Sequence, residues 1–197
     1  MSEFWIYLKI GLHHVLDIKG YDHLLFLIAL TVPYAFKDWK RILLLVSVFT
    51  IGHTLALILS VFGVIMIKSG LVEFLIPVTI LLTALYNLFA AGKTGKKNSV
   101  NVIGFITLFF GIIHGLGFSN YFKSLLSGSA ADKIAPLLEF ALGIEIAQVI
   151  VVLVVLLIWF ILQHFARFSK RDFTLVTSAF VIGVVVPMLL ESDLWNN

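Results

Sequence analysis

The chain has 197 residues, of which 60% are hydrophobic and 13% are charged, and its formal net charge is +3. A chain of this length with so few charged groups cannot cover the surface of a water-soluble domain. The composition therefore excludes a soluble protein and indicates an integral membrane protein. The chain contains no cysteine, which excludes disulfide bonds and thiolate metal sites. Any bound metal must therefore be held by nitrogen and oxygen ligands.

The apolar segments have the length of helices and show no alternation of apolar and polar residues, so they predict transmembrane helices. We expect an amphipathic helix at 3–18, followed by hydrophobic segments at 21–36, 40–67, 70–91, 100–120, 134–164 and 173–191. A crossing takes about 20 residues, and the first two segments are shorter than this. The predicted fold class is all-α, a polytopic transmembrane bundle of six to seven helices that forms a single membrane domain over residues 1–197.

Lysine and arginine concentrate in three connections between these segments. Residues 37–41, 93–97 and 167–171 hold nine of the fourteen Lys and Arg residues, and they alternate with connections in which acidic and basic residues balance. The positive-inside rule therefore predicts that these three connections are cytoplasmic. The partner expected for this charge is the anionic surface of a lipid bilayer, and we expect no nucleic-acid partner.

Several imidazole and carboxylate groups are predicted to lie at a common depth towards the outer side. His53 lies about twelve residues from Arg41, or about 18 Å at roughly 1.5 Å per residue, which places it just past the midplane. The other members of this layer come from the outer ends or outer halves of their segments: His14, Asp22, His23, His114, Glu145 and Gln148. Ionisable groups inside a membrane indicate a functional site, and this ligand set suits nickel, cobalt or zinc.

We therefore predict a divalent transition-metal site with the ligands His14, His23, His53, His114, Asp22 and Glu145. Two further residues are expected to support these ligands through hydrogen bonds, Asp17 behind His14 and Gln148 one turn from Glu145.

Neighbouring residues compete for the inward direction at two positions. His13 and His14 are about 100° apart on a helix, so only one can point inward, and His14 is favoured because Asp17 shares its face. His23 is assigned to the metal, whereas Asp22 is either a ligand at the helix start or a helix N-cap.

Two glycines give His114 a structural context. Gly111 and Gly115 form a pair of small residues one turn apart, which allows a neighbouring helix to approach closely and brings His114 within ligand reach of it. Asn87 is predicted nearer the cytoplasmic end, outside this layer unless its helix is broken at Pro77. His164 is assigned to the membrane interface.

Four motifs occur along the chain in a fixed order: GLHHVLDIKGYDHLLFLIAL, FTIGHTLAL, GIIHGLGFS and LGIEIAQ. In this order the motifs resemble the HupE/UreJ family of small bacterial membrane proteins, over roughly residues 5–165. The resemblance implies a multi-pass protein of the bacterial inner membrane associated with nickel, and in some members cobalt, supply to hydrogenase or urease. It implies that the Asp and His of DHLLF are signature ligands, and it carries over to these positions: Asp22, His23, His53, His114, Glu145 and Gln148. Tyr86 departs from the acidic residue that usually precedes the asparagine of the family's fourth motif.

Two classes of function follow from these observations. The family resemblance favours a metal permease, in which the ion is captured at the outer histidine layer and passed inward. The position of the polar layer on one side favours an intramembrane zinc hydrolase or transferase that acts on a lipid or a membrane-anchored substrate. In that alternative, three histidines hold zinc, and Glu145 or Asp22 is the general base for a metal-bound water.

Overall fold

The structure is a computed structural model that describes residues 3–92 and 100–192, without the side chains of residues 100 and 101. Its α-helices are α1 (Glu3–Leu16), α2 (Asp22–Thr31), α3 (Trp39–Val61), α4 (Ser69–Ala90), α5 (Val100–Leu125), α6 (Ile134–Phe165) and α7 (Lys170–Leu190). Two short 3-10 helices, η1 (Phe36–Asp38) and η2 (Ala131–Lys133), precede α3 and α6. The described residues form no strand, so the prediction of an all-helical chain is confirmed.

Five of the described helices, α3 to α7, are long and apolar enough to cross a membrane. Helix α1 has 14 residues and α2 has ten, which at roughly 1.5 Å per residue gives about 21 Å and about 15 Å. Neither length reaches across a hydrocarbon core of about 30 Å. The predicted count of six to seven crossings is therefore not confirmed.

Most helix boundaries lie within three residues of the predicted segments, and the exceptions have local causes. Helix α2 ends at Thr31, because Pro33 has no backbone N–H with which to continue the helical hydrogen bonds. Helix α3 ends at Val61 although the apolar run continues to 67, because Gly63 takes a positive φ of 74° and turns the chain. Helix α5 continues to Leu125, five residues beyond the predicted end.

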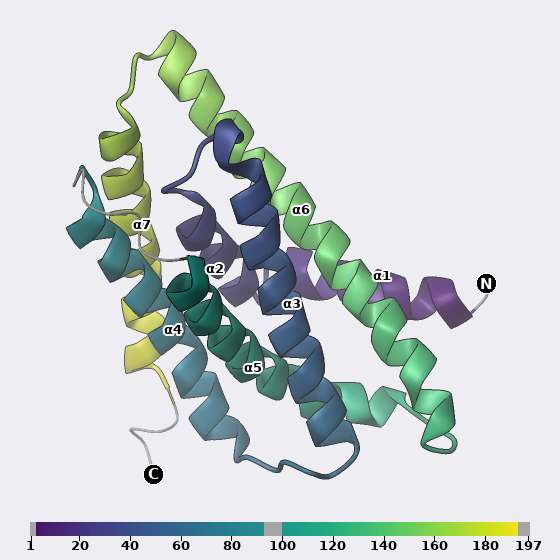
Figure 1. The fold of residues 1–197 in the computed structure, drawn as a ribbon. Helices are drawn as coiled ribbons and strands as arrows, with labels where there is room; N and C mark the ends of the chain where they lie inside the picture. The colour runs from purple at the N-terminus through teal and green to yellow at the C-terminus, as the bar shows by residue number, and fades with distance from the viewer. Residues whose placement is uncertain (1–2, 93–99, 193–197) are drawn as a thin grey trace.

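Helix α2 lies in the middle of the bundle (Figure 1). Seven of its ten residues are buried, as expected for a helix that is apolar on all sides. It contacts α4, α6 and α7, while α3 packs along α5, α1 crosses α6, and α4 lies beside α7. The N-terminal end of α2, where Asp22 and His23 lie, is thus held inside the bundle.

Glycines bring two pairs of helices into backbone contact. A Cβ atom added to Gly111 would overlap the carbonyl oxygen of Phe49, and one added to Gly115 would overlap that of His53. The close approach predicted for these glycines is therefore present, and the partner helix is α3. Gly11 of α1 and Gly143 of α6 meet in the same way, each against the backbone of the other helix. These contacts fix the positions of the histidines beside them.

Two of the predicted basic segments lie at one end of the bundle. The rings of Phe36 and Phe160 lie 6.3 Å apart between centroids, and the Lys170 ammonium group donates to the carbonyl oxygen of Tyr34. The basic segments 37–41 and 167–171 therefore lie at the same end, where α3 begins and α6 ends. The third predicted basic segment, 93–97, lies outside the described residues.

Candidate metal centre

Four imidazole rings from four helices lie together, and His23 is close to the other three. His14 lies in the last turn of α1, His23 is the second residue of α2, and His53 and His114 lie within α3 and α5. Measured between ring centroids, His23 is 4.4 Å from His14, 5.6 Å from His53 and 5.1 Å from His114. All four predicted histidines are thus brought into one cluster.

Two groups of potential ligands share His23. One consists of His14, His23 and His53, and the other of Asp22, His23 and His114. Within each group, one ligand atom per residue lies within 4.8 Å of the others. Among the described residues, neither group contains Glu145.

The cluster contains imidazole nitrogens that have no hydrogen-bond partner. Within the described part of the chain, these buried atoms are Nε2 of His14, Nε2 of His23, both ring nitrogens of His53, and Nδ1 of His114. Leaving a buried polar atom unsatisfied costs about 1–3 kcal/mol, so such a concentration calls for a ligand. A divalent transition-metal ion accepts lone pairs from neutral imidazole, and the donor set fits such an ion.

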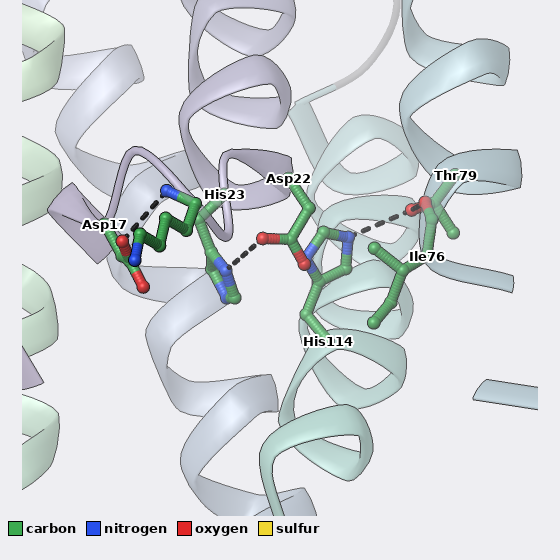
Figure 2. Close-up of polar contacts among 7 residues, drawn as sticks. Asp17, Asp22, His23, Ile76, Thr79 and His114 are labelled. Carbon is green, nitrogen blue, oxygen red and sulfur yellow. Dashed lines mark hydrogen bonds and ion pairs between the residues drawn. The ribbon is translucent and has the colours of Figure 1, made fainter. Parts of the chain in front are cut away.

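Two side chains orient the histidines that lie nearest Asp22 (Figure 2). Nδ1 of His23 lies 3.2 Å from Oδ1 of Asp22, and Nε2 of His114 lies 3.0 Å from Oγ1 of Thr79. The N-cap of α2 is Tyr21, and α2 has no side-chain cap, so Asp22 contacts His23 and does not cap the helix. Thr79 is not among the residues predicted from the sequence. Its signal is a spacing of four between the polar residues Thr79, Thr83 and Asn87 of α4.

The pKa shifts of His14 and Asp22, which lie outside the long helices, favour metal binding. Burial, and then the proximity of His23, lower the pKa of His14 well below its ordinary value, which keeps this ring neutral. Burial raises the pKa of Asp22, but the proximity of the His23 ring and the hydrogen bond with it outweigh this and hold the pKa below the ordinary value. Neutral imidazole and ionised carboxylate are the forms that bind a metal.

An open cavity of about 930 Å³ leads to the cluster, and its lining includes His14, Asp22, His23 and His114. Glu73 near the start of α4 and Tyr121 near the end of α5 also line it, which places its mouth towards the end opposite the described basic segments. His53 is fully buried and lies outside this lining.

Among the described residues, His13 and Asp17 are exposed and belong to neither ligand group. His13 is exposed, whereas the ring of His14 lies 3.9 Å from that of Phe118 between centroids. Asp17 lies beyond the end of α1, where Oδ1 accepts a hydrogen bond of 2.9 Å from the Lys19 amide (Figure 2). Asp17 thus lies at the cavity wall with its carboxylate engaged by Lys19.

A family model described as HupE / UreJ protein matches residues 1–191. The chain belongs to the HupE/UreJ family. This family is associated with nickel and cobalt transport, which agrees with a donor set of imidazole and carboxylate. Searches of curated proteins and of solved structures find no significant match.

In this HupE/UreJ protein, Glu145 and Gln148 form a second polar cluster between α3 and α6. Glu145 accepts hydrogen bonds of 2.6 Å from Ser47 and 2.5 Å from Thr50, and Oγ1 of Thr50 lies 3.2 Å from Oε1 of Gln148. Thr50 precedes His53 by three residues on α3, so the two clusters are one helical turn apart. The single layer expected from depth is therefore divided into a histidine cluster and a carboxylate cluster.

Asn87 does not join either cluster. Its amide nitrogen donates a 2.6 Å hydrogen bond to the carbonyl oxygen of Ala29, which joins α4 to α2. Helix α4 continues through Pro77 without a break, so Asn87 keeps the position that an uninterrupted helix gives it.

Proposed function

We propose that this HupE/UreJ protein binds a nickel or cobalt ion at the histidine cluster and carries it across the membrane. The observation that carries the proposal is the group of unpartnered imidazole nitrogens around His23. The proposed ligands are His14, His23, His53, His114 and Asp22. The support is their mutual distance, the burial of His23, His53 and His114, and the association of the family with these metals.

The two ligand groups suggest the order of binding. The ion enters the cavity, where Asp17 and Glu73 add negative charge, and first meets the group that contains Asp22 and His114. It then passes to the group that contains the fully buried His53. Because His23 belongs to both groups, the ion keeps one ligand during this transfer.

We propose Glu145 and Gln148 as the oxygen ligands that receive the ion after His53. The half-buried carboxylate of Glu145 accepts its hydrogen bonds from the neutral hydroxyl groups of Ser47 and Thr50, which do not cancel its negative charge. Uncompensated charge at this depth is costly, and a passing divalent cation removes that cost.

The proposed location is the inner membrane of a bacterium, with segments 37–41, 93–97 and 167–171 in the cytoplasm. The support is the joint position of the two described basic segments at one end of the bundle. The cavity then opens away from the cytoplasm, and the ion is captured from that side.

The test uses purified protein, in detergent and in lipid vesicles. Elemental analysis and titration measure bound nickel, cobalt and zinc, and ion uptake is measured in the vesicles. We expect His23→Ala, which removes a ligand from both groups, to abolish binding and uptake, and His114→Ala, which removes a ligand from one group, to weaken both. His164→Ala serves as the control, because His164 is an exposed imidazole near the far end of α6. A wild-type protein that binds the ion but takes none into vesicles would falsify the transport proposal.

The size of the cavity favours a second candidate function, an intramembrane zinc hydrolase or transferase. About 930 Å³ exceeds the space that an ion needs, and Ile10, Ile76 and Phe118 give the lining an apolar part suited to a lipid or membrane-anchored substrate. A zinc ion held by the histidines would supply an activated water. Asp22 is the nearer candidate base, because Glu145 lies in the other cluster. Product formed from phospholipid or lipopeptide by zinc-loaded protein, without ion uptake, would favour this function.

A further inference from the structure

Thr79 of α4 makes two contacts through one hydroxyl group (Figure 2). Its Oγ1 lies 2.7 Å from the carbonyl oxygen of Ile76 and 3.0 Å from Nε2 of His114. Thr79 and His114 are both buried, with 2% and 1% of their surfaces exposed. Water therefore does not compete for these groups, and the two contacts determine where the protons lie.

The shorter contact, that with the Ile76 carbonyl oxygen, favours one arrangement of protons. A carbonyl oxygen only accepts, so the single hydroxyl proton of Thr79 is donated to Ile76. The hydroxyl oxygen is then an acceptor towards His114, and Nε2 of His114 must be the donor. A neutral imidazole carries one N–H, so Nδ1 of His114 is unprotonated. This Nδ1 is the buried nitrogen of His114 that lacks a partner among the described residues.

We propose that Thr79 is a positioning residue that keeps the proton of His114 on Nε2 and so presents the lone pair of Nδ1 to the metal ion. This inference rests on the proposed function, because it assigns a role in binding the same ion. It concerns a residue outside both ligand groups that acts through His114. Hydrogen bonds of this kind fix the tautomer and ring orientation of metal-binding histidines.

The same logic applies to His23, which gives the assignment internal consistency. Ionised Asp22 only accepts, so the 3.2 Å contact requires a proton on Nδ1 of His23. The unpartnered nitrogen of that ring is Nε2. In both His114 and His23, the unprotonated ring nitrogen is therefore the one that has no hydrogen-bond partner among the described residues.

The first test reads the tautomer in metal-free protein. Protein with ¹⁵N-labelled histidine rings is examined by NMR in detergent, and the His114 signals are assigned by their loss in His114→Gln. We expect the wild type to carry the proton on Nε2. Thr79→Val keeps the shape of the side chain but removes the acceptor, so we expect protonated Nδ1 to become detectable. Thr79→Ser restores the hydroxyl and should restore the wild-type tautomer.

A matched control lies one turn along the same helix. Thr83 donates a 2.8 Å hydrogen bond to the carbonyl oxygen of Thr79, so its hydroxyl also bonds to the backbone of α4. Thr83→Val should leave the His114 signals in the wild-type form. A wild-type tautomer in Thr79→Val, or the same change in Thr83→Val, would overturn the inference.

The second test measures nickel affinity. Loss of a hydrogen bond behind a metal-binding histidine lowers affinity about 10-fold to 100-fold, and we expect this loss in Thr79→Val with recovery in Thr79→Ser. Equal affinities of wild type and Thr79→Val would contradict the role. If wild-type protein binds no nickel, the proposed function fails, and the tautomer in metal-free protein still decides the assignment of Thr79.

Discussion

His53 is fully buried, and its ring nitrogens have no hydrogen-bond partner in the described part of the chain. A residue kept for stability alone would have its polar atoms satisfied, because unsatisfied ones are destabilising. We therefore attribute the buried ring of His53 to ligand binding.

The variant His53→Leu separates stability from binding. Replacing an unsatisfied polar ring by an apolar side chain removes a desolvation cost, so the metal-free variant should unfold at the same temperature as wild type or higher. Nickel at 100 times its Kd stabilises a protein by about 2.7 kcal/mol, and this stabilisation should be smaller in the variant, which keeps only the group of Asp22, His23 and His114. Thermal unfolding in detergent with and without nickel measures both effects. A lower midpoint without metal would show that His53 is structural.

Glu145 offers a residue-scale test of the inward step. Glu145→Gln keeps the size of the side chain and an oxygen that accepts from Ser47 or Thr50, but it removes the charge. We expect nickel binding within about 2-fold of wild type and uptake into vesicles reduced about 10-fold or more, the size of a barrier increase of about 1.4 kcal/mol. Glu139→Gln, on the same helix nearer its start, is the control and should transport normally. Loss of equilibrium binding in Glu145→Gln would place Glu145 among the first ligands.

The sequence predicted the four histidines but not their hydrogen-bond partners. Charged loops set the depth of each helix, and depth was sufficient to gather His14, His23, His53 and His114. Whether Glu145 faces those rings or the hydroxyl groups of α3 depends on the rotation and register of two helices. These are set by packing, which a residue count along one helix does not contain.

At the scale of elements, the contact between α3 and α5 shows how glycine controls the site. Helix α5 contains one glycine that contacts a neighbouring backbone and one that does not. A Cβ atom on Gly111 would overlap the backbone of Phe49, whereas a Cβ atom on Gly104 would meet nothing within 4 Å. Sequence alone indicated that small residues permit close approach, but the identity of the partner helix required the structure.

This pair of glycines gives a matched prediction. Gly111→Ala forces α3 and α5 apart and should lower the stability by about 1–3 kcal/mol, as overpacking does. Gly104→Ala gains helix propensity without a clash and should raise the stability by up to about 1 kcal/mol. Unfolding in detergent measures both, and nickel titration should show weaker binding in Gly111→Ala alone. Equal stability of the two variants would contradict the backbone contact.

The two N-terminal helices show why the predicted number of crossings is not confirmed. Hydrophobic composition marks a segment as buried without saying whether lipid or protein surrounds it. Helix α2 is apolar because it lies in the centre of the bundle against α4, α6 and α7, and its ten residues do not need to span the bilayer.

At the scale of the whole molecule, composition alone predicted a helical membrane protein, because a chain with 13% charged residues has few other ways to fold. Its orientation can be tested directly because the natural chain contains no cysteine. Lys37→Cys probes the end with the basic segments, and Met66→Cys probes the connection between α3 and α4, where Met66 is 85% exposed.

We expect a membrane-impermeant maleimide to label Met66→Cys in intact cells and to label Lys37→Cys only after permeabilisation. The physical reason is the bias of Lys and Arg towards the cytoplasmic side. The cysteine-free parent shows the background. The reverse pattern would mean that the cavity opens to the cytoplasm, and the direction proposed for ion capture would have to be inverted.

The glycine contacts join α1 to α6 and α3 to α5 as two closely packed units, which are linked to each other by the hydrogen bonds of Glu145. His14 belongs to the first of these two units, whereas His53 and His114 belong to the second. A small displacement of one unit relative to the other would change how many nitrogens surround the ion without any ring rotating. Affinity would then depend on the relative placement of two rigid bodies, which is a simple way to hold an ion in one conformation and release it in another.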